Sequence, residues 1–193
     1  MFKSILLSMS LFVFVFSCNK SSDATENNIQ SKQEITSVKD NSNKEKKQTN
    51  VFTPFFAPDF ELKTTTDEII KLSDYKGKVV IIDFWGLWCP PCKKMIPVLA
   101  QFVNECSKEG VSLLGIHSVS NFPGNDKIDF FAGEVGVNYP MLIGTSENEK
   151  NYQITAFPTL YIIGKDGFVN HKFMGYHSLE SIKEKVREEL NKK

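Results

Sequence analysis

Cysteine is scarce in this chain of 193 residues, which contains four. Only Cys89 and Cys92 stand close together, and no second pair occurs at metal-ligand spacing, so a four-ligand zinc site is disfavoured. The formal net charge is zero, and no basic stretch interleaved with aromatic residues occurs, which argues against nucleic acid as a partner. We therefore expect neither a bound metal nor nucleic acid.

Long hydrophobic runs are also lacking. The longest, Ile5 to Phe16, follows Lys3 and is too short to read as a membrane span. We interpret residues 1–18 as a lipoprotein-type signal peptide, because the last four residues, ending at Cys18, resemble the lipobox of bacterial lipoproteins, whose cysteine is lipidated. An ordinary signal peptide and an uncleaved anchor are the alternatives. Each exports the chain to an oxidising compartment.

Aromatic residues are absent from residues 19–50, which are rich in Ser, Asn, Lys, Glu and Thr. Such a composition cannot bury enough apolar surface to fold, so we predict a disordered tether with a reach of roughly 30 Å. With the lipid anchor, the tether would hold the protein at a membrane on the periplasmic side of a bacterial cell envelope. Residues 51–193 have the usual size of one domain.

A strand and a helix are predicted to meet at the two cysteines. Val79 to Trp85 has the apolar run of a strand buried on both faces, and Lys93 to about Ser107 repeats apolar residues at helical spacing. Cys89 and Cys92 then lie at the mouth and in the first turn of that helix, where unpaired N–H groups and the helix dipole stabilise an anion. Thiolate chemistry at neutral pH is therefore expected.

The residues between the cysteines are prolines. The fixed φ angles of Pro90 and Pro91 suit a helix start and stiffen the loop, so they are expected to tune the redox poise. Pro97 lies inside the helical pattern and predicts a kink. A purely structural disulfide is a weaker interpretation, because cross-linking so short a loop stabilises little.

The other elements are predicted from periodicity and turn residues. Phe52 to Leu72 indicates a β-hairpin, and Val111 to Val119 indicates a strand parallel to the first, with His117 given no role. Further expectations are a helix over 127–134 capped by Asp126, a strand over 139–143, a helical turn over 147–152, a hairpin from 160 to 174 and a final helix capped by Ser178.

Three motifs together resemble the thioredoxin superfamily: Trp88 to Cys92, Pro97 in the helix, and Phe157-Pro158-Thr159 before the penultimate strand. The N-terminal hairpin and the added helix make the chain most similar to membrane-tethered thiol-disulfide oxidoreductases of the TlpA/ResA type. The resemblance covers about residues 56–190. It implies an α/β, thioredoxin-like fold: a central mixed β-sheet flanked by helices, with an N-terminal β-hairpin and an inserted helix.

The resemblance also implies a mechanism. Cys89, nearer the surface, would attack a substrate disulfide as a thiolate, and Cys92 would resolve the mixed disulfide. Asp83 would relay the proton of Cys92, its pKa raised by burial, unless it merely ends its strand and faces water. A cis bond before Pro158 would face the two sulfurs. The residues expected to contact substrate are Trp88, Pro90, Pro91, Phe157 and Thr159.

The implied function is reduction of disulfides in exported proteins, apocytochrome c among them, by a monomer that receives electrons from a membrane donor and needs no cofactor beyond its redox-active disulfide. An oxidant or isomerase, and a copper-binding module of the same fold, stay open. A peroxidase of the peroxiredoxin type is disfavoured because Gly86, three residues before Cys89, stands where such peroxidases carry Thr or Ser.

Some reductases of this family carry an acidic residue near the sulfurs, just after the second central strand. In this chain that region is Ser118 to Asn121, which contains no acid, and Asp83 is expected to take over its role. Trp85 either flanks the site or belongs to the core.

Overall fold

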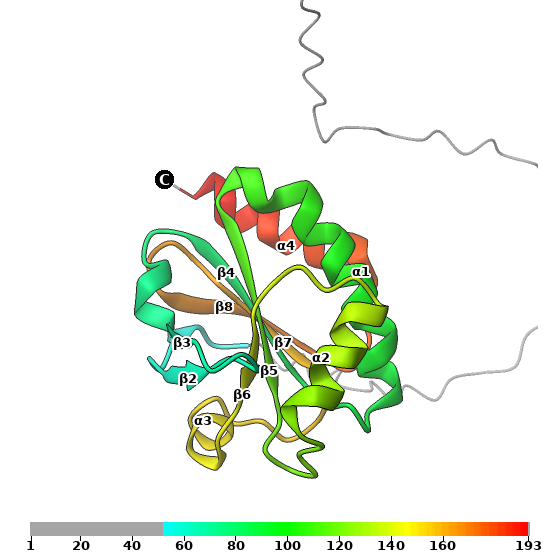
Figure 1. Ribbon diagram of the computed structural model, residues 1–193. Coiled ribbons are helices and arrows are strands. Elements are labelled where there is room, and N and C mark those ends of the chain that lie inside the picture. Colours follow the sequence, from blue (N-terminus) through cyan, green and yellow to red (C-terminus); the bar gives the residue numbers. More distant parts are fainter. Residues whose placement is uncertain (1–51, 193) are drawn as a thin grey trace, which may run out of the picture. The chain divides into compact units, whose positions relative to one another are not determined.

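The computed structural model describes residues 52–192 (Figure 1). The signal peptide expected over 1–18 with its Cys18, and the tether expected over 19–50, lie outside the described residues. The strands are β1 (Phe55–Phe56), β2 (Glu61–Lys63), β3 (Ile69–Lys71), β4 (Val79–Trp85), β5 (Val111–His117), β6 (Met141–Ile143), β7 (Thr159–Ile163) and β8 (Phe168–Met174). The helices are α1 (Pro90–Cys106), α2 (Asn125–Glu134), α3 (Ser146–Asn151) and α4 (Leu179–Asn191), with short 3-10 helices η1 (Leu72–Tyr75) and η2 (Ser107–Glu109).

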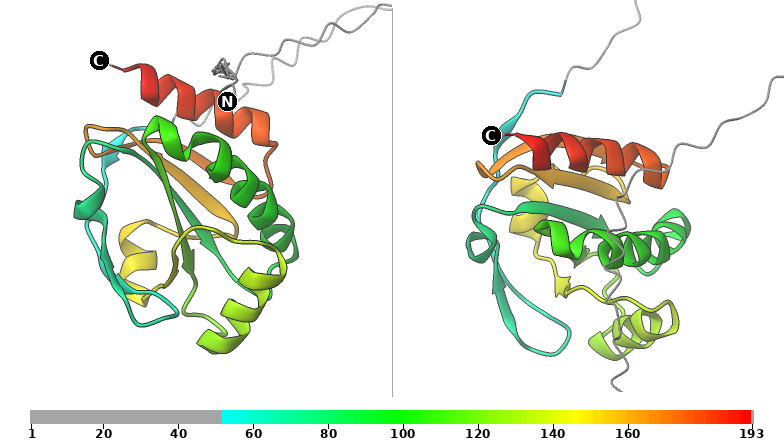
Figure 2. Two further views of the ribbon diagram at one scale, coloured as in Figure 1. Left: turned by 45° about the horizontal axis from the view of Figure 1, so that its top comes forward. Right: turned by 90° about the horizontal axis from the view of Figure 1, so that it is seen from above.

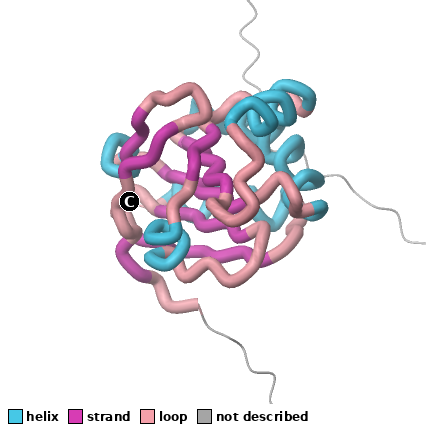
Figure 3. Tube along the Cα trace, turned by 60° about the horizontal axis from the view of Figure 1, so that its bottom comes forward, coloured by secondary structure: helices cyan, strands magenta, loops and turns pink. Residues whose placement is uncertain are grey.

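A mixed six-stranded sheet in the order β1-β8-β7-β4-β5-β6 forms the centre. β4 pairs in parallel with β5 and antiparallel with β7, so the predicted βαβ unit around α1 is confirmed. Helices α1, α2 and α4 lie on one side of the sheet, and the β2–β3 hairpin and α3 lie on the other (Figures 1 and 2). Figure 3 shows the same strands with helices on both sides. The expected thioredoxin-like α/β fold is confirmed.

β4 is buried along its whole length, as predicted. Its side chains alternate between two cores: Ile81 and Trp85 belong to the core under α1, whereas Ile82 and Phe84 belong to the core under the hairpin. Burying each such side chain stabilises the fold by about 1.5–3 kcal/mol. The same alternation places Asp83 on the α1 side of the sheet.

The predicted N-terminal hairpin is confirmed as the antiparallel pair β2–β3. It attaches to the edge of the main sheet, because Thr64 forms a bridge with Leu142 and the Thr65 N–H donates to the Met141 carbonyl at 3.1 Å. Strand β1 was not predicted. Its two residues pair with β8, and so short a segment between prolines carries no readable period.

Helix α1 begins at Pro90, so Cys92 lies in its first turn, as predicted, although the apolar period that indicates the helix begins only at Lys93. The start of α2 differs from the prediction. Helix α2 begins at Asn125 after Gly124, and no side chain caps it, so the predicted cap at Asp126 is wrong: Asp126 lies in the first turn, where its charge suits the helix dipole. The cap at Ser178 is confirmed, because its side chain accepts a hydrogen bond from the Ser181 N–H.

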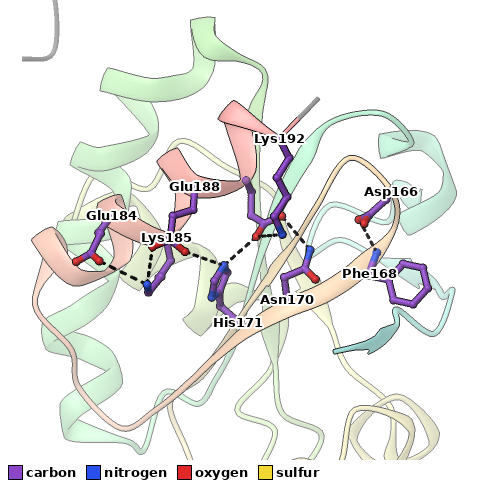
Figure 4. Close-up of polar contacts among 9 residues, drawn as sticks. Asp166, Phe168, Asn170, His171, Glu184, Lys185, Glu188 and Lys192 are labelled. Carbon is purple, nitrogen blue, oxygen red and sulfur yellow. Dashed lines mark hydrogen bonds and ion pairs between the residues drawn. The ribbon is translucent and has the colours of Figure 1, made fainter. Parts of the chain in front are cut away.

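A buried carboxylate ties α4 to β8 (Figure 4). The oxygens of Glu189 accept hydrogen bonds from His171 Nε2 at 2.8 Å, Asn170 Nδ2 at 2.9 Å and Lys192 Nζ at 2.7 Å. These three partners are labelled in Figure 4. These hydrogen bonds join α4 to β8, and removing one partner would leave a buried charge uncompensated, which is strongly destabilising. Within residues 52–192, no helix combines the length and apolarity needed to cross a membrane.

Candidate active site

The two cysteines lie where β4 leads into α1. The Cys89 N–H donates to the Gly86 carbonyl at 3.0 Å, and the Lys93 N–H donates to the Cys89 carbonyl at 3.2 Å, so Cys89 stands directly before the helix. The sulfurs of Cys89 and Cys92 are joined in a disulfide. Cys89 is 6% exposed and Cys92 is fully buried, which agrees with Cys89 as the sulfur nearer the surface.

The start of α1 favours negative charge on Cys89. The Cys92 N–H donates to Cys89 Sγ at 3.3 Å. The first turn of α1, all of it within the described chain, contains no acidic residue that would oppose a thiolate. Because the N–H groups and the dipole of a helix start stabilise an anion, this geometry favours a thiolate on Cys89, whereas Cys92 is fully buried.

An accessible, largely apolar rim surrounds Cys89. Trp88 is 38% exposed, and its ring lies so close over Gly86 that a Cβ there would come within 2.6 Å of the indole. The Trp88 ring packs edge-on against Phe157, with centroids 6.0 Å apart. Pro90 is exposed and Pro91 is half-buried. Four of the residues predicted to contact substrate thus lie at or beside the mouth of the disulfide.

The loop before β7 contributes to this rim, because its Phe157 packs against Trp88. The Phe157–Pro158 peptide is cis, as expected. Pro158 is buried, and its carbonyl accepts a hydrogen bond from the Gly175 N–H at 2.8 Å. Thr159 is fully buried and its hydroxyl donates to the Ala156 carbonyl at 2.8 Å, so its side chain has no surface for a substrate. We correct its predicted role from substrate contact to support of the loop.

Asp83 is fully buried, so the alternative that it faces water is wrong. Neither of its carboxylate oxygens has a hydrogen-bond partner among the described residues. Burial raises the pKa of Asp83 from 3.8 to about 7, because desolvation penalises the charged form. A carboxyl group with this pKa can both accept and donate a proton near neutral pH. It lies on the sheet face that carries Cys92.

His117, for which the sequence predicts no role, is a buried anchor of the active-site loop. Its Nε2 accepts a hydrogen bond from the Leu87 N–H at 3.0 Å, and its Nδ1 donates to the Ser118 carbonyl at 2.7 Å. Burial lowers the pKa of His117, which favours this neutral form. Its ring contacts Trp85 and Trp88 edge-on, with centroids 4.9 and 5.3 Å away. Trp85, fully buried, is therefore both core and support of the site.

An acidic residue also lies at the end of β5, and it comes from α3. The Glu149 carboxylate accepts hydrogen bonds from the Ser118 hydroxyl at 2.6 Å and the Val119 N–H at 3.0 Å. The stretch after β5 has no acid of its own between Ser118 and Asn121. The sequence could have indicated a role for His117, because a polar residue at the end of a strand parallel to β4 lies beside the loop that follows β4. Nothing in the sequence around Glu149 indicates its contact with Ser118.

Replacing His117 with phenylalanine should destabilise the protein. The variant keeps an aromatic ring between the tryptophans but leaves the Leu87 N–H without its acceptor, which is expected to cost about 1–3 kcal/mol in the free energy of unfolding. Urea unfolding of the oxidised wild type and variant measures this loss in the free energy of unfolding. Phe122→Leu is the matched control, because Phe122 contacts the same ring at 5.9 Å without a hydrogen bond. Equal losses in both variants would contradict the anchoring role.

Comparisons with known proteins agree with this site. The AhpC/TSA family matches residues 56–172. The thiol-disulfide oxidoreductase ResA of Geobacillus thermodenitrificans is 32% identical over 131 residues, which cover 66% of this chain and 72% of that protein. Within residues 52–192, no three His, Cys, Asp or Glu side chains gather as a metal site.

Solved structures show the same fold. A thiol:disulfide interchange protein of the thioredoxin family from Chlorobium tepidum has a TM-score of 0.65 and 25% identity, covering 72% of this chain and 99% of that one. The exposed lipoprotein thioredoxin Etrx1 of Streptococcus pneumoniae has a TM-score of 0.57 and 28% identity, covering 68% and 99%. The chain therefore belongs to the AhpC/TSA family of thioredoxin-like proteins and is a ResA-like thiol-disulfide oxidoreductase.

Proposed function

We propose that the protein reduces disulfides of exported proteins, with Cys89 as the attacking sulfur. The observation that carries this proposal is the hydrogen bond from the Cys92 N–H to Cys89 Sγ, at the accessible start of a helix. It stabilises the thiolate that thiol-disulfide exchange requires. The apolar rim formed by Trp88 and Phe157 suits an unfolded or extended protein segment around a cystine.

The reaction proceeds in two exchanges. The Cys89 thiolate attacks one sulfur of the substrate disulfide, and the other substrate sulfur leaves as a thiolate. Cys92 then gives its proton to Asp83 and attacks Cys89, which forms the Cys89–Cys92 disulfide and releases the second substrate thiolate. The substrate has gained two electrons and the enzyme has lost two. A dithiol donor, which we propose to be a membrane protein, must return them before the next turnover.

The reducing direction is supported by what stabilises Cys89. The hydrogen-bond donor to its sulfur is the neutral backbone N–H of Cys92 rather than a cationic side chain. Strong oxidants of this chemistry have a heavily stabilised reduced form, whereas modest stabilisation of the thiolate accompanies a low potential. The alternative, an oxidant of exported proteins, would use the same residues.

We also propose that the domain is exported and held at the membrane by a lipid on Cys18. The lipobox-like end of residues 1–18 supports this, and the similar pneumococcal protein is named an exposed lipoprotein. Labelled fatty acid should be incorporated into the wild-type chain but not into Cys18→Ser. Equal labelling of the wild type and of Cys18→Ser would contradict the proposed lipid on Cys18 and would leave the proposed redox chemistry unaffected.

The reduction potential of the Cys89–Cys92 couple is expected to lie near −250 mV or lower, since roughly −270 mV is typical of thioredoxin. The full chain is equilibrated with dithiothreitol or glutathione mixtures, and the fraction of disulfide is measured by thiol trapping. Thirty millivolts correspond to about 1.4 kcal/mol for a two-electron couple, so the two directions are well separated. A potential near about −120 mV would make the protein an oxidant instead.

A further inference from the structure

A row of aromatic side chains continues from the mouth of the disulfide to the loop that follows β5. Trp88 is 38% exposed, and Phe122 of that loop is 41% exposed. Both rings pack edge-on against the ring of His117, with centroids 5.3 and 5.9 Å away, and Trp88 packs in the same way against Phe157. Single exposed hydrophobic side chains are common on proteins, whereas a contiguous row beside a reactive group indicates a binding surface.

His117 joins the two exposed rings into one surface. The imidazole is fully buried, and it accepts the Leu87 N–H of the loop that carries Trp88. It also donates to the Ser118 carbonyl, at the start of the loop that carries Phe122. Because one buried ring contacts both exposed rings and binds both loops, Trp88 and Phe122 form a single apolar surface with the imidazole beneath it.

This surface lies on the other side of the site from Phe157. Strand β4 lies between β5 and β7 in the sheet, so the loop after β5 and the loop before β7 border the cysteines from opposite sides. Phe122 belongs to the first of these loops and Phe157 to the second. The apolar rim around Cys89 therefore extends in both directions along a bound protein segment.

The loop that carries Phe122 is held in place by the protein itself. The Ser118 N–H donates to the Trp85 carbonyl at 2.8 Å. The Glu149 carboxylate, from α3, accepts hydrogen bonds from the Ser118 hydroxyl at 2.6 Å and the Val119 N–H at 3.0 Å. A surface that is ordered before a ligand arrives loses less conformational freedom on binding. Glu149 is thus a positioning residue for this loop.

The chemistry of the loop selects an apolar ligand. Residues 118–124 contain no charged side chain, and Val119, which is 40% exposed, adds aliphatic surface beside the ring of Phe122 in the same loop. Burial lowers the pKa of His117, so the imidazole beneath the two rings is neutral. Covering a charged side chain on such a surface is costly, because the charge loses water and gains no partner.

We propose that Phe122, together with Trp88 and Val119, forms a specificity subsite for an aromatic or large aliphatic side chain of the substrate close to the cystine under attack. The inference rests on the proposed function, because it names the kind of protein segment that the dithiol reduces. An extended segment advances about 3.3 Å per residue, so a side chain about two to four residues from the attacked cysteine lies over these rings. Phe122 takes no part in the exchange of sulfur bonds.

The test measures the rate constant at which the reduced full chain reduces a set of peptide disulfides, followed by thiol trapping. Each uncharged peptide has one cysteine, joined by a disulfide to a second copy of itself. Phenylalanine stands two, three or four residues from the cysteine on either side, and the reference peptide has serine at all these places. We expect the wild type to prefer the best phenylalanine peptide about tenfold, the lower end of what apolar contacts contribute to discrimination.

Replacing Phe122 with serine should bring this preference within about twofold of none. Phe122→Leu keeps an apolar side chain and should retain most of the preference. The reduction potential of the Cys89–Cys92 couple should not differ between the wild type and Phe122→Ser, because the subsite binds substrate and not the disulfide. A shifted potential with equal slowing of every peptide would mean that Phe122 only supports the site, and would overturn the inference.

Two other exposed aromatic residues give the controls. Phe130 on α2 is 72% exposed, and Phe130→Ser should keep the wild-type preference. Tyr176 is 55% exposed and follows Gly175, whose N–H donates to the Pro158 carbonyl, so it lies on the β7 side of the mouth. A preference that survives in Phe122→Ser but is lost in Tyr176→Ser would place the apolar side chain on that side and overturn the inference.

A cycle of the two phenylalanines tests their contact directly. If the Phe122 ring binds the phenylalanine of the peptide, removing either ring should slow the reaction about as much as removing both, whereas independent effects would multiply. Multiplied losses would overturn the inference, and so would a wild type that reduces all the peptides at one rate. A wild type that reduces none of them would instead overturn the proposed function, so the two failures are distinguishable.

Discussion

Replacing Cys92 with alanine is expected to stop turnover and to leave substrate covalently attached to Cys89. Cys89 keeps its place before α1, so the first exchange still proceeds, but no second thiol is in reach to resolve the mixed disulfide. Multiple turnover should fall by at least about a thousandfold, as when a nucleophile is removed. Non-reducing electrophoresis and intact mass of the trapped species measure both effects.

The controls for this variant use the other cysteines of the domain. Cys89→Ala should abolish turnover and trap nothing, because the attacking sulfur is gone. Cys106→Ala should retain turnover, since Cys106 lies buried toward the far end of α1. Trapping by Cys89→Ala in place of Cys92→Ala would reverse the roles assigned to the two sulfurs.

Replacing Asp83 with asparagine is expected to change how stability depends on pH. In the folded protein burial raises the pKa of this carboxyl to about 7, whereas in the unfolded chain it returns to about 3.8. Between these values the folded state holds a proton that the unfolded state has lost, so the free energy of unfolding falls as pH rises from about 4 to 7 and is level above that. The fall is on the order of 4 kcal/mol.

The variant should lose this slope. At pH 4 the two proteins differ little, and at pH 8 Asp83→Asn should be the more stable by up to about 4 kcal/mol, because it no longer buries a charge. Urea unfolding at pH 4, 5.5 and 8 measures the difference. The exposed Asp126 on α2 gives the control, since Asp126→Asn should keep the wild-type slope. A slope retained in Asp83→Asn would show that another group titrates.

The same substitution should slow the reaction. Without Asp83 as the proposed acceptor of the Cys92 proton, resolution by Cys92 is expected to fall about a hundredfold at pH 7, the lower end of what a general base contributes. The stabilised variant would then be the poorer enzyme. That combination is the expected signature of a buried acid kept for chemistry rather than for folding.

Much of the site was predictable because its signals are local. The apolar run of β4, the helical period after Cys92 and the prolines between the cysteines are each read within a few residues, and together they predict a dithiol at a helix start. The same run favours burial of Asp83, since a strand buried on both faces leaves no position in water, but only the structure excluded the alternative that Asp83 ends the strand and faces water.

The remaining features depend on contacts between distant parts of the chain. His117 meets Leu87 across 30 residues, and Glu149 meets Ser118 across 31. These pairings require the strand order and the register of β4 with β5, which no local period encodes. The sequence by itself determined the strand, the helix and the reactive cysteines, whereas the tertiary structure alone decided which polar side chains surround them, because packing brings those groups together only after the sheet has formed.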